Sequence, residues 1–236
     1  MMENLTLLLP GLAVSLRLLG LALLVGLPLG LLAGVALFNG PRWLRWPVAA
    51  LTEIGRGFPA LVTVYLVYFG FPQVGVVLND MAALTVAFGF TTASYTADLF
   101  RSALASVPKA QHEAIAALAL PPLRGFALIL LPQALRHALP ALVGFAVIVF
   151  QATALAFSIG LKEMIGIAYD EGTLRFDVLP LLIAAAAFYL AVSLLLTALA
   201  SSLQRRLDPA ARPATRRRAP ACPSPHLTPT THKESA

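Results

Sequence analysis

The sequence predicts an all-α membrane protein with about five membrane-spanning helices. Of its 236 residues, 58% are hydrophobic and only 12% are charged, whereas about a quarter of the residues in a soluble domain carry a charge. Five apolar stretches also approach or exceed the length of about 20 residues that a helix needs to cross a hydrocarbon core of about 30 Å. We therefore expect the chain to lie in lipid.

The predicted spans cover residues 12–38, 58–77, 82–99, 139–161 and 179–203. The first span contains four glycines, namely Gly20, Gly26, Gly30 and Gly34. Small residues at four-residue spacing allow a second backbone to approach closely in lipid. We therefore expect the first span to pack tightly against another helix.

The positions of Lys and Arg predict how the spans are oriented. Basic residues follow the first, third and fifth spans: Arg42, Arg45, Arg101, Lys109, Arg124, Arg136, Arg205, Arg206, Arg212 and 216–218. The loop at 71–81 has none, and the loop at 162–177 offsets its basic residues with acidic ones. Because Lys and Arg gather in cytoplasmic loops, the alternation places the N-terminus outside and the C-terminus in the cytoplasm.

The chain divides into a transmembrane domain at 1–207 and a tail at 208–236. The tail is rich in Pro, Ala, Thr and Arg and has almost no large apolar residues, a composition typical of disorder. We expect a disordered, basic, cytoplasmic tail. Its arginines serve as an ordinary topology signal or contact anionic lipid.

Several classes of function are disfavoured by the motifs that the chain does not contain. Its single cysteine, Cys222, and its four histidines show no metal-ligand spacing. The phosphate-binding pattern G-x-x-x-x-G-K-[ST] and hydrolase motifs are missing, so we expect no catalytic residues and no cofactor on this chain. The net charge of +6 is sorted by membrane side and not gathered with aromatic residues as in a nucleic-acid site.

The loop between the third and fourth spans, at about 101–136, contains a predicted short helix. Pro108 suits the first turn of a helix, and Pro121 and Pro122 end it. Ala110, Ala114 and Ala117 share one stripe of this helix, and Gln111, Ile115 and Leu118 form a neighbouring stripe. Periodicity leaves two interpretations open: the helix docks a soluble partner, or it packs against the spans of its own chain.

Polar residues within the spans are candidates for a substrate pathway, since polar side chains in lipid usually face a bundle interior. The candidates are Tyr95, Gln151 and Thr153. Gln151 either lines the pathway or forms a hydrogen bond between helices. Asp98 precedes Arg101 by three residues, which favours a structural ion pair.

Several motifs, in order, resemble those of ABC importer permeases of the polar amino-acid uptake family. The run Glu-Ala-Ile-Ala-Ala-Leu-Ala at 113–119, followed by Leu-Pro-Gln-Ala-Leu-Arg at 131–136, resembles the EAA coupling-loop motif. The stretches at 53–59 and 68–72 are similar to the Arg-Gly-Thr-Pro and Tyr-Phe-Gly-Leu-Pro stretches of that family. Tyr95, Asp98 and Arg101 resemble its Tyr-x-x-Glu-x-x-Arg pattern. The resemblance covers about residues 12–207.

This resemblance implies a MetI-like permease fold in the bacterial inner membrane. The chain would be the multi-pass permease subunit of a binding-protein-dependent importer for an amino acid or similar small solute. Its implied partners are a second permease subunit, identical or related, a periplasmic or lipid-anchored solute-binding protein, and an ABC ATPase dimer that binds ATP and Mg²⁺. The residues implied to couple to the ATPase are Ala110, Gln111, Glu113, Ala114, Ala117 and Ala119.

The sequence departs from the family pattern at three places. Ala110 and Ala119 stand where the family usually has Gly. Ala enters the φ > 0 region only at a cost of about 1 kcal/mol, so the turn at Ala119 is either helical or strained. Gln151 and Ala152 replace a Lys-Asp pair, which favours a more apolar solute.

Two other functions remain to be weighed against the importer permease. A self-sufficient secondary transporter or channel driven by an ion gradient often has inverted repeats, and the sequence shows no clear repeat. A membrane anchor without transport function explains the apolar stretches but not the ordered motifs.

Overall fold

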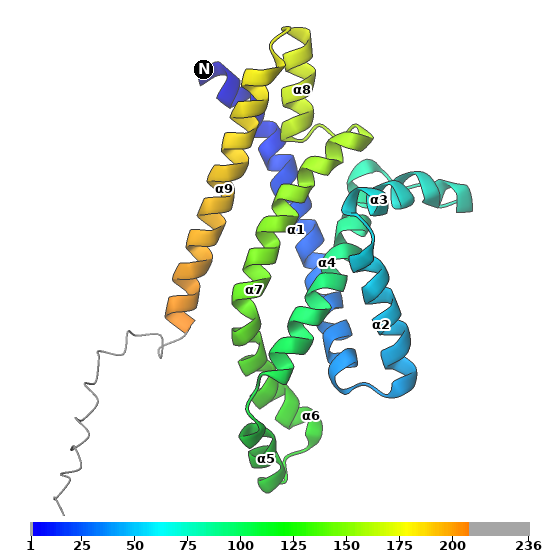
Figure 1. Ribbon diagram of the computed structural model, residues 1–236, viewed down its shortest axis with the longest axis vertical. Helices are drawn as coiled ribbons and strands as arrows, with labels where there is room; N and C mark the ends of the chain where they lie inside the picture. Colours follow the sequence, from blue (N-terminus) through cyan, green and yellow to red (C-terminus); the bar gives the residue numbers. More distant parts are fainter. Residues whose placement is uncertain (1, 208–236) are drawn as a thin grey trace, which may run out of the picture.

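In a computed structural model, residues 2–207 form a bundle of long helices (Figure 1). The predicted tail lies outside these described residues, and side chains are described for 6–202. Every regular element in the described part is helical, which confirms the all-α prediction. The elements are α1 (Met2–Asn39), α2 (Arg42–Gly57), α3 (Ala60–Tyr65), η1 (Leu66–Gly70), η2 (Phe71–Val74), α4 (Asp80–Ala105), α5 (Lys109–Ala117), α6 (Pro122–Gly125), η3 (Phe126–Leu130), α7 (Leu131–Ala152), η4 (Thr153–Ile159), α8 (Met164–Leu174) and α9 (Val178–Leu207).

Three helical stretches are long and apolar enough to cross a membrane by themselves: Thr6–Asn39, Pro122–Ile159 and Val178–Ser202. Helix α2 and the stretch from α3 to η2 pass the same test together as one bent segment. Helix α4 corresponds to the third predicted span, and its 26 residues make it about 39 Å long. Helix α4 is less apolar than those three stretches because it carries Thr and Ser residues. Several of these, including Thr92, Ser94 and Thr96, are buried against neighbouring helices.

The second predicted span, a single apolar stretch at 58–77, is wrong in its boundaries. Helix α2 already begins at Arg42, and the chain bends by 108° between Gly57 and Ala60. Phe58, with φ −83° and ψ 135°, precedes Pro59, and the residue before a proline is disfavoured in the helical region. The proline also lacks the N–H that would continue the helix. The second span is therefore two helical pieces joined at a sharp corner.

Helices α1 and α4 run side by side with their backbones in close contact, as the glycine spacing predicted. A Cβ added at Gly26 would lie 2.5 Å from Cβ of Thr92, and one at Gly34 would lie 2.7 Å from the carbonyl oxygen of Ala97. A Cβ at Gly30 would overlap the Thr96 hydroxyl, whereas Gly20 has nothing within 4 Å. Three of the four glycines therefore form the contact surface with α4.

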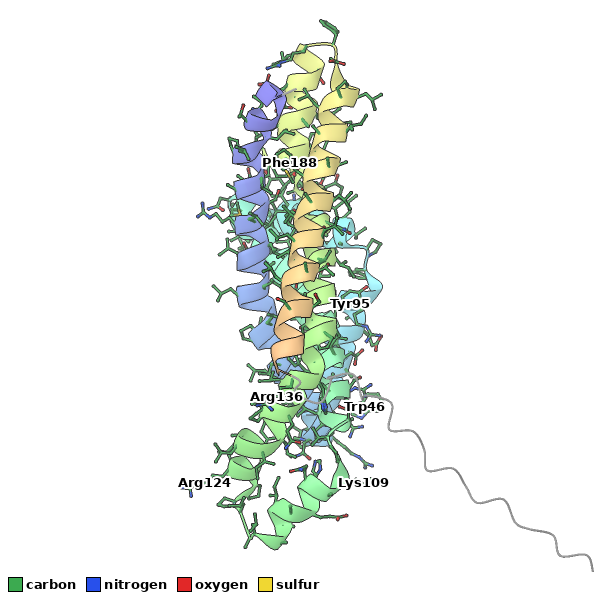
Figure 2. The ribbon with its side chains drawn as sticks, turned by 90° about the vertical axis from the view of Figure 1, so that its left-hand side faces the viewer. Trp46, Tyr95, Lys109, Arg124, Arg136 and Phe188 are labelled. Carbon is green, nitrogen blue, oxygen red and sulfur yellow. The ribbon has the colours of Figure 1, made fainter. Side chains whose placement is uncertain are left out.

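The loops predicted to be basic gather at one end of the bundle. The α1–α2 connection, α5, α6 and the start of α7 all lie at the lower end in Figure 1, opposite the N-terminus and α8. Figure 2 shows Trp46 and Arg136 at a similar height near this end, with Lys109 and Arg124 beyond them. The arrangement agrees with the predicted alternation of spans. That the lower end is cytoplasmic stays a prediction from the positive residues.

The upper end of the bundle is held by a buried carboxylate. Glu163 is 0% exposed and caps α8 by accepting a 2.9 Å hydrogen bond from the Gly166 amide. Its Oε2 also accepts a 2.8 Å bond from the Tyr189 hydroxyl of α9, and the hydroxyl of Ser15 of α1 lies 3.5 Å away. Burial raises the pKa of the Glu163 carboxyl, although these hydrogen bonds oppose the shift. One side chain thus ties α1, α8 and α9 together.

Helix α5 ends in a Schellman motif with alanine at the position that favours glycine. The amide of Leu120 donates a 3.2 Å hydrogen bond to the carbonyl of Ile115, and the amide of Ala119 donates a 3.0 Å hydrogen bond to the carbonyl of Ala116. Ala119 adopts φ 48°, a left-handed conformation that costs an L-residue roughly 1–2 kcal/mol. The turn is therefore strained and not helical.

We predict that Gly26→Ala destabilises the protein by about 1–3 kcal/mol, since the added methyl group overpacks the α1–α4 contact. Gly20→Ala is the matched control on the same helix, with open space around it. It should leave stability unchanged or raise it by up to about 1 kcal/mol, because Ala favours helix. Thermal unfolding of the purified protein in detergent measures both. Equal effects of the two substitutions would contradict the packing described.

We predict that Ala119→Gly stabilises the end of α5 by about 1 kcal/mol, because glycine adopts φ > 0 without strain. Hydrogen exchange of the 109–120 backbone should slow by roughly fivefold, as expected where local opening controls exchange. Ala116→Gly, inside the same helix, should instead speed exchange by a similar factor. Faster exchange in Ala119→Gly would disprove the strained turn.

Candidate functional site

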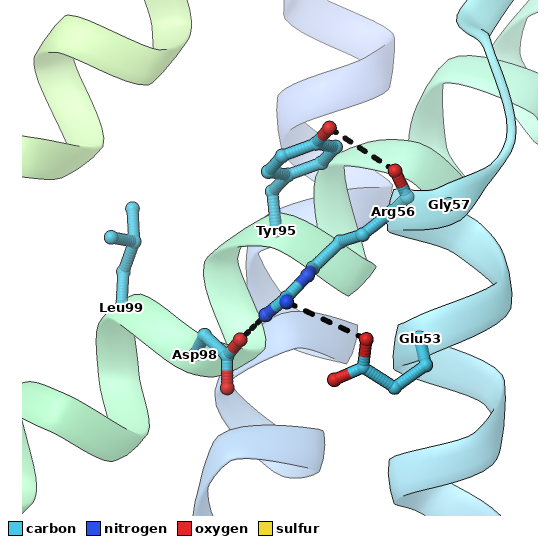
Figure 3. A pocket seen from close by; sticks show the side chains of 6 residues that line it. All are labelled: Glu53, Arg56, Gly57, Tyr95, Asp98 and Leu99. Atoms are coloured by element: carbon cyan, nitrogen blue, oxygen red, sulfur yellow. Dashed lines mark hydrogen bonds and ion pairs between the residues drawn. The ribbon is translucent and has the colours of Figure 1, made fainter.

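A charged hollow lies between α2 and α4, just below the corner at Phe58. It has a volume of about 480 Å³ and is lined by Glu53, Arg56, Gly57, Tyr95, Asp98 and Leu99. Figure 3 shows the Arg56 side chain reaching from α2 toward Asp98 on α4, with Glu53 on its other side. The side chains of Arg56 and Asp98 are 32% and 30% exposed, so this ion pair is only partly buried.

Two ion pairs lie within single helices, and the one between Asp98 and Arg101 was expected from sequence spacing. Asp98 accepts from Nε of Arg101 at 3.5 Å, and Glu53 accepts from Arg56 at 3.5 Å. The pair between Arg56 and Asp98 joins two helices and was not predicted. Helical spacing identifies partners three or four residues apart but carries no signal for partners on different helices.

Tyr95 joins the charged hollow to a second, apolar cavity. Its hydroxyl donates a 3.3 Å hydrogen bond to the backbone carbonyl of Arg56. Its ring stacks on Phe145 of α7, with 5.3 Å between the ring centroids. Tyr95 lines both spaces, so this predicted pathway residue stands where a charged and an apolar environment meet.

The apolar cavity lies between α3, α4 and α7 and has a volume of about 310 Å³. Its lining combines aromatic and aliphatic side chains with three hydroxyl groups: Phe58, Ala60, Phe88, Thr91, Thr92, Tyr95, Phe145, Ile148, Val149 and Ala152. The buried Oγ1 of Thr92 has no hydrogen-bond partner among the described residues. An apolar space with a few polar groups is the usual composition of a small-molecule site.

The other two predicted pathway residues lie outside both spaces. Gln151 donates a 3.4 Å hydrogen bond to the Ser193 hydroxyl of α9, which matches the helix-to-helix interpretation. Thr153 is 0% exposed and donates a 2.6 Å bond to the carbonyl of Phe150. Its neighbour Ala152 lines the apolar cavity instead. Sequence position alone did not separate these faces, because the chain changes from α7 to the 3₁₀ helix η4 at Thr153.

Helix α5 packs against its own chain on one side, as one of the two interpretations expected, and docking of a soluble partner stays a prediction for its exposed side. On the anchored side, Gln133 of α7 donates a 3.4 Å hydrogen bond to Gln111, and Ile115 packs beside Gly125. The other predicted coupling residues are all exposed: Ala110, Glu113, Ala114, Ala117 and Ala119. Gln111 therefore positions the helix, and the remaining set is open to a partner.

One residue of α5 packs against an apolar cluster between α4 and α7. This cluster consists of Phe100, Ala103, Leu104, Val107, Leu130, Ala134 and Ala138, with Ile115 packed against it. Nearby, the Ser106 hydroxyl at the end of α4 lies 3.0 Å from Nδ1 of His137 on α7. Ile115 of α5 thus packs against a cluster to which both α4 and α7 contribute.

Comparisons with known proteins identify the family. The model of the binding-protein-dependent transport system inner membrane component family matches residues 26–213. The probable amino-acid ABC transporter permease protein YckA of Bacillus subtilis is 33% identical over 171 residues, which are 72% of this chain and 76% of that protein. The arginine transport system permease protein ArtQ of the same organism is 30% identical over 200 residues, 84% of this chain and 91% of that protein.

A solved structure shows the same fold. A chain from the crystal structure of an amino acid ABC transporter with histidines superposes with a TM-score of 0.81 at 25% identity, covering 87% of this chain and 96% of that one. The fold and the family match thus agree with the motifs in the coupling loop and the spans. This chain belongs to the binding-protein-dependent transport system inner membrane component family and is a multi-pass permease subunit of an ABC importer.

Proposed function

We propose that the charged hollow and the apolar cavity form the solute path, and that α5 couples this path to a separate ATPase. The observation that carries the proposal is the position of Tyr95, which lines both spaces on one continuous surface of α4. A solute at Tyr95 would contact Arg56 and Asp98 on one side and Phe145 on the other. Names of similar proteins support an amino acid as cargo.

The two spaces together suit an amino acid with an apolar side chain. Arg56 and Asp98 present opposite charges that complement the carboxylate and ammonium groups of a zwitterion. The neighbouring cavity is lined without any charged side chain, and burying a charged cargo group there without a partner would be costly. The replacement of the family's Lys-Asp pair by Gln151 and Ala152 points in the same direction.

Force from the ATPase would enter through the exposed face of α5. This face presents Ala110, Ala114 and Ala117, whose small side chains permit close approach, with Glu113 beside them. Its anchored face is attached to α7 through Gln111 and to the cluster at the base of α4. Since α4 carries Tyr95 and Asp98 while α7 carries Phe145 and Ile148, movement of α5 would reshape the walls of the path.

The proposed complex contains two permease subunits, an ATPase dimer that binds ATP and Mg²⁺, and a solute-binding protein. Family membership supports this assembly, because the family is named for its dependence on a binding protein. It weighs against a self-sufficient transporter driven by an ion gradient. Gradient-driven uptake by the chain reconstituted without an ATPase would reverse that judgement.

We predict that Glu113→Lys abolishes ATPase copurification or uncouples hydrolysis from uptake, because it reverses the charge on the docking face of α5. The measurement is the ratio of ATPase to permease after affinity purification, followed by solute-stimulated hydrolysis. Asp177→Lys makes the same charge change at an exposed position in the α8–α9 turn, and its ATPase ratio should match the unmodified protein. An unchanged ratio together with normal transport in Glu113→Lys would exclude this face as the docking site.

We predict that Ile148→Trp lowers uptake at least tenfold, since the larger ring would fill the apolar cavity. Ile183→Trp on α9 is the matched control, because both isoleucines are 59% exposed and only Ile148 lines the cavity. Cells with the complete transporter would be offered labelled leucine, phenylalanine, arginine and glutamate separately, and uptake of the apolar pair is expected. Uptake of arginine or glutamate alone would disprove the apolar cargo, whereas equal effects of the two substitutions would disprove the path.

A further inference from the structure

The first turns of α2 form a cationic surface that the transport function does not use. Arg42, Arg45, Trp46 and Ala49 line a hollow of about 610 Å³. Their spacing of three and four residues places them along one face of the helix. This hollow does not share any lining residue with the two spaces of the solute path.

The positive charge of this surface is not neutralised within the described side chains, 6–202. Neither Arg42 nor Arg45 forms an ion pair there, and the first turn of α2 contains no acidic residue. The N-cap residue Pro41 supplies no side-chain cap, so the positive end of the helix dipole adds to the two guanidinium groups. Three sources of positive charge therefore converge, and no acidic side chain among residues 6–202 pairs with either arginine.

The depth of the surface indicates where its ligand lies. Trp43 and Trp46 are 76% and 77% exposed, and exposed tryptophans of membrane proteins concentrate at the level of the lipid headgroups. Figure 2 places Trp46 at a similar height to Arg136, with Lys109 and Arg124 farther out. The start of α2 therefore lies at the level expected for lipid headgroups.

We propose that Arg42, Arg45 and Trp46 bind the phosphate of an anionic phospholipid from the leaflet at this end of the bundle. Guanidinium groups bind phosphate oxygens through paired hydrogen bonds, and the indole would lie beside the headgroup. A lipid fits the surface better than a soluble anion, because the two exposed tryptophans beside the arginines are placed as headgroup-level anchors. Bound here, it would brace the helix that carries Arg56 into the solute path.

The chain contains two tryptophans, Trp43 and Trp46, so fluorescence excited selectively at tryptophan reports on the start of α2. The full chain would be placed in phosphatidylcholine nanodiscs containing a small fraction of either brominated phosphatidylglycerol or brominated phosphatidylcholine. We expect several-fold more efficient quenching by the anionic lipid, since each basic residue near a membrane surface contributes roughly a fivefold preference. Equal quenching by the two brominated lipids would overturn the proposal.

Variants separate a built site from general attraction to positive charge. Arg42→Gln with Arg45→Gln should abolish the preference while leaving quenching by brominated phosphatidylcholine unchanged, which also shows that the variant is folded. Lys109→Gln with Arg124→Gln removes the same charge beyond the level of Trp46 and should retain the preference. Loss of the preference in both double variants would show a diffuse charge effect and refute the site.

Inorganic phosphate distinguishes a lipid from a soluble anion. At constant ionic strength, excess phosphate should leave quenching by brominated phosphatidylglycerol unchanged, since the acyl chains contribute to binding. Release of the quenching by phosphate would assign the surface to soluble anions and overturn the lipid proposal.

Discussion

The close contact between α1 and α4 makes the arrangement of the other helices possible. Gly26, Gly30 and Gly34 let the two backbones meet, and this contact shelters the polar residues of α4 from lipid. Without a sheltering neighbour, Thr92 and Thr96 would expose hydroxyl groups to hydrocarbon, which is unfavourable. The contact therefore allows the polar helix that carries the candidate path to stand inside a membrane.

The sharp corner at Phe58 and Pro59 creates the space beside this helix. The 108° bend turns α3 away from the direction of α2, and Phe58 and Ala60 at this corner form one wall of the apolar cavity. Arg56, one turn before the corner, is left facing Asp98. A local effect of proline thus places a charged hollow and an apolar cavity next to each other.

Helix α5 lies at the end of the bundle and is attached to the helices that line the candidate site. It is too short to span a bilayer, and its anchored face packs near the ends of the two helices that line the proposed path. Its exposed face carries small side chains whose burial against a partner would need little rearrangement. The strained left-handed conformation at Ala119 keeps the chain turning sharply into α6, so the position of α5 is defined despite the missing glycine.

Sequence patterns alone were enough to predict the all-α membrane class, the family, the glycine contact surface on α1, the short loop helix, and the ion pair of Asp98 with Arg101. These features are local, because hydropathy, helical periodicity and proline positions act within a few turns. Packing between helices was needed to bring Arg56 to Asp98. It also placed Tyr95 between the charged hollow and the apolar cavity, and left Gln151 and Thr153 outside both of these spaces. Those arrangements depend on how separate helices rotate and approach one another, and packing between helices determines that rotation.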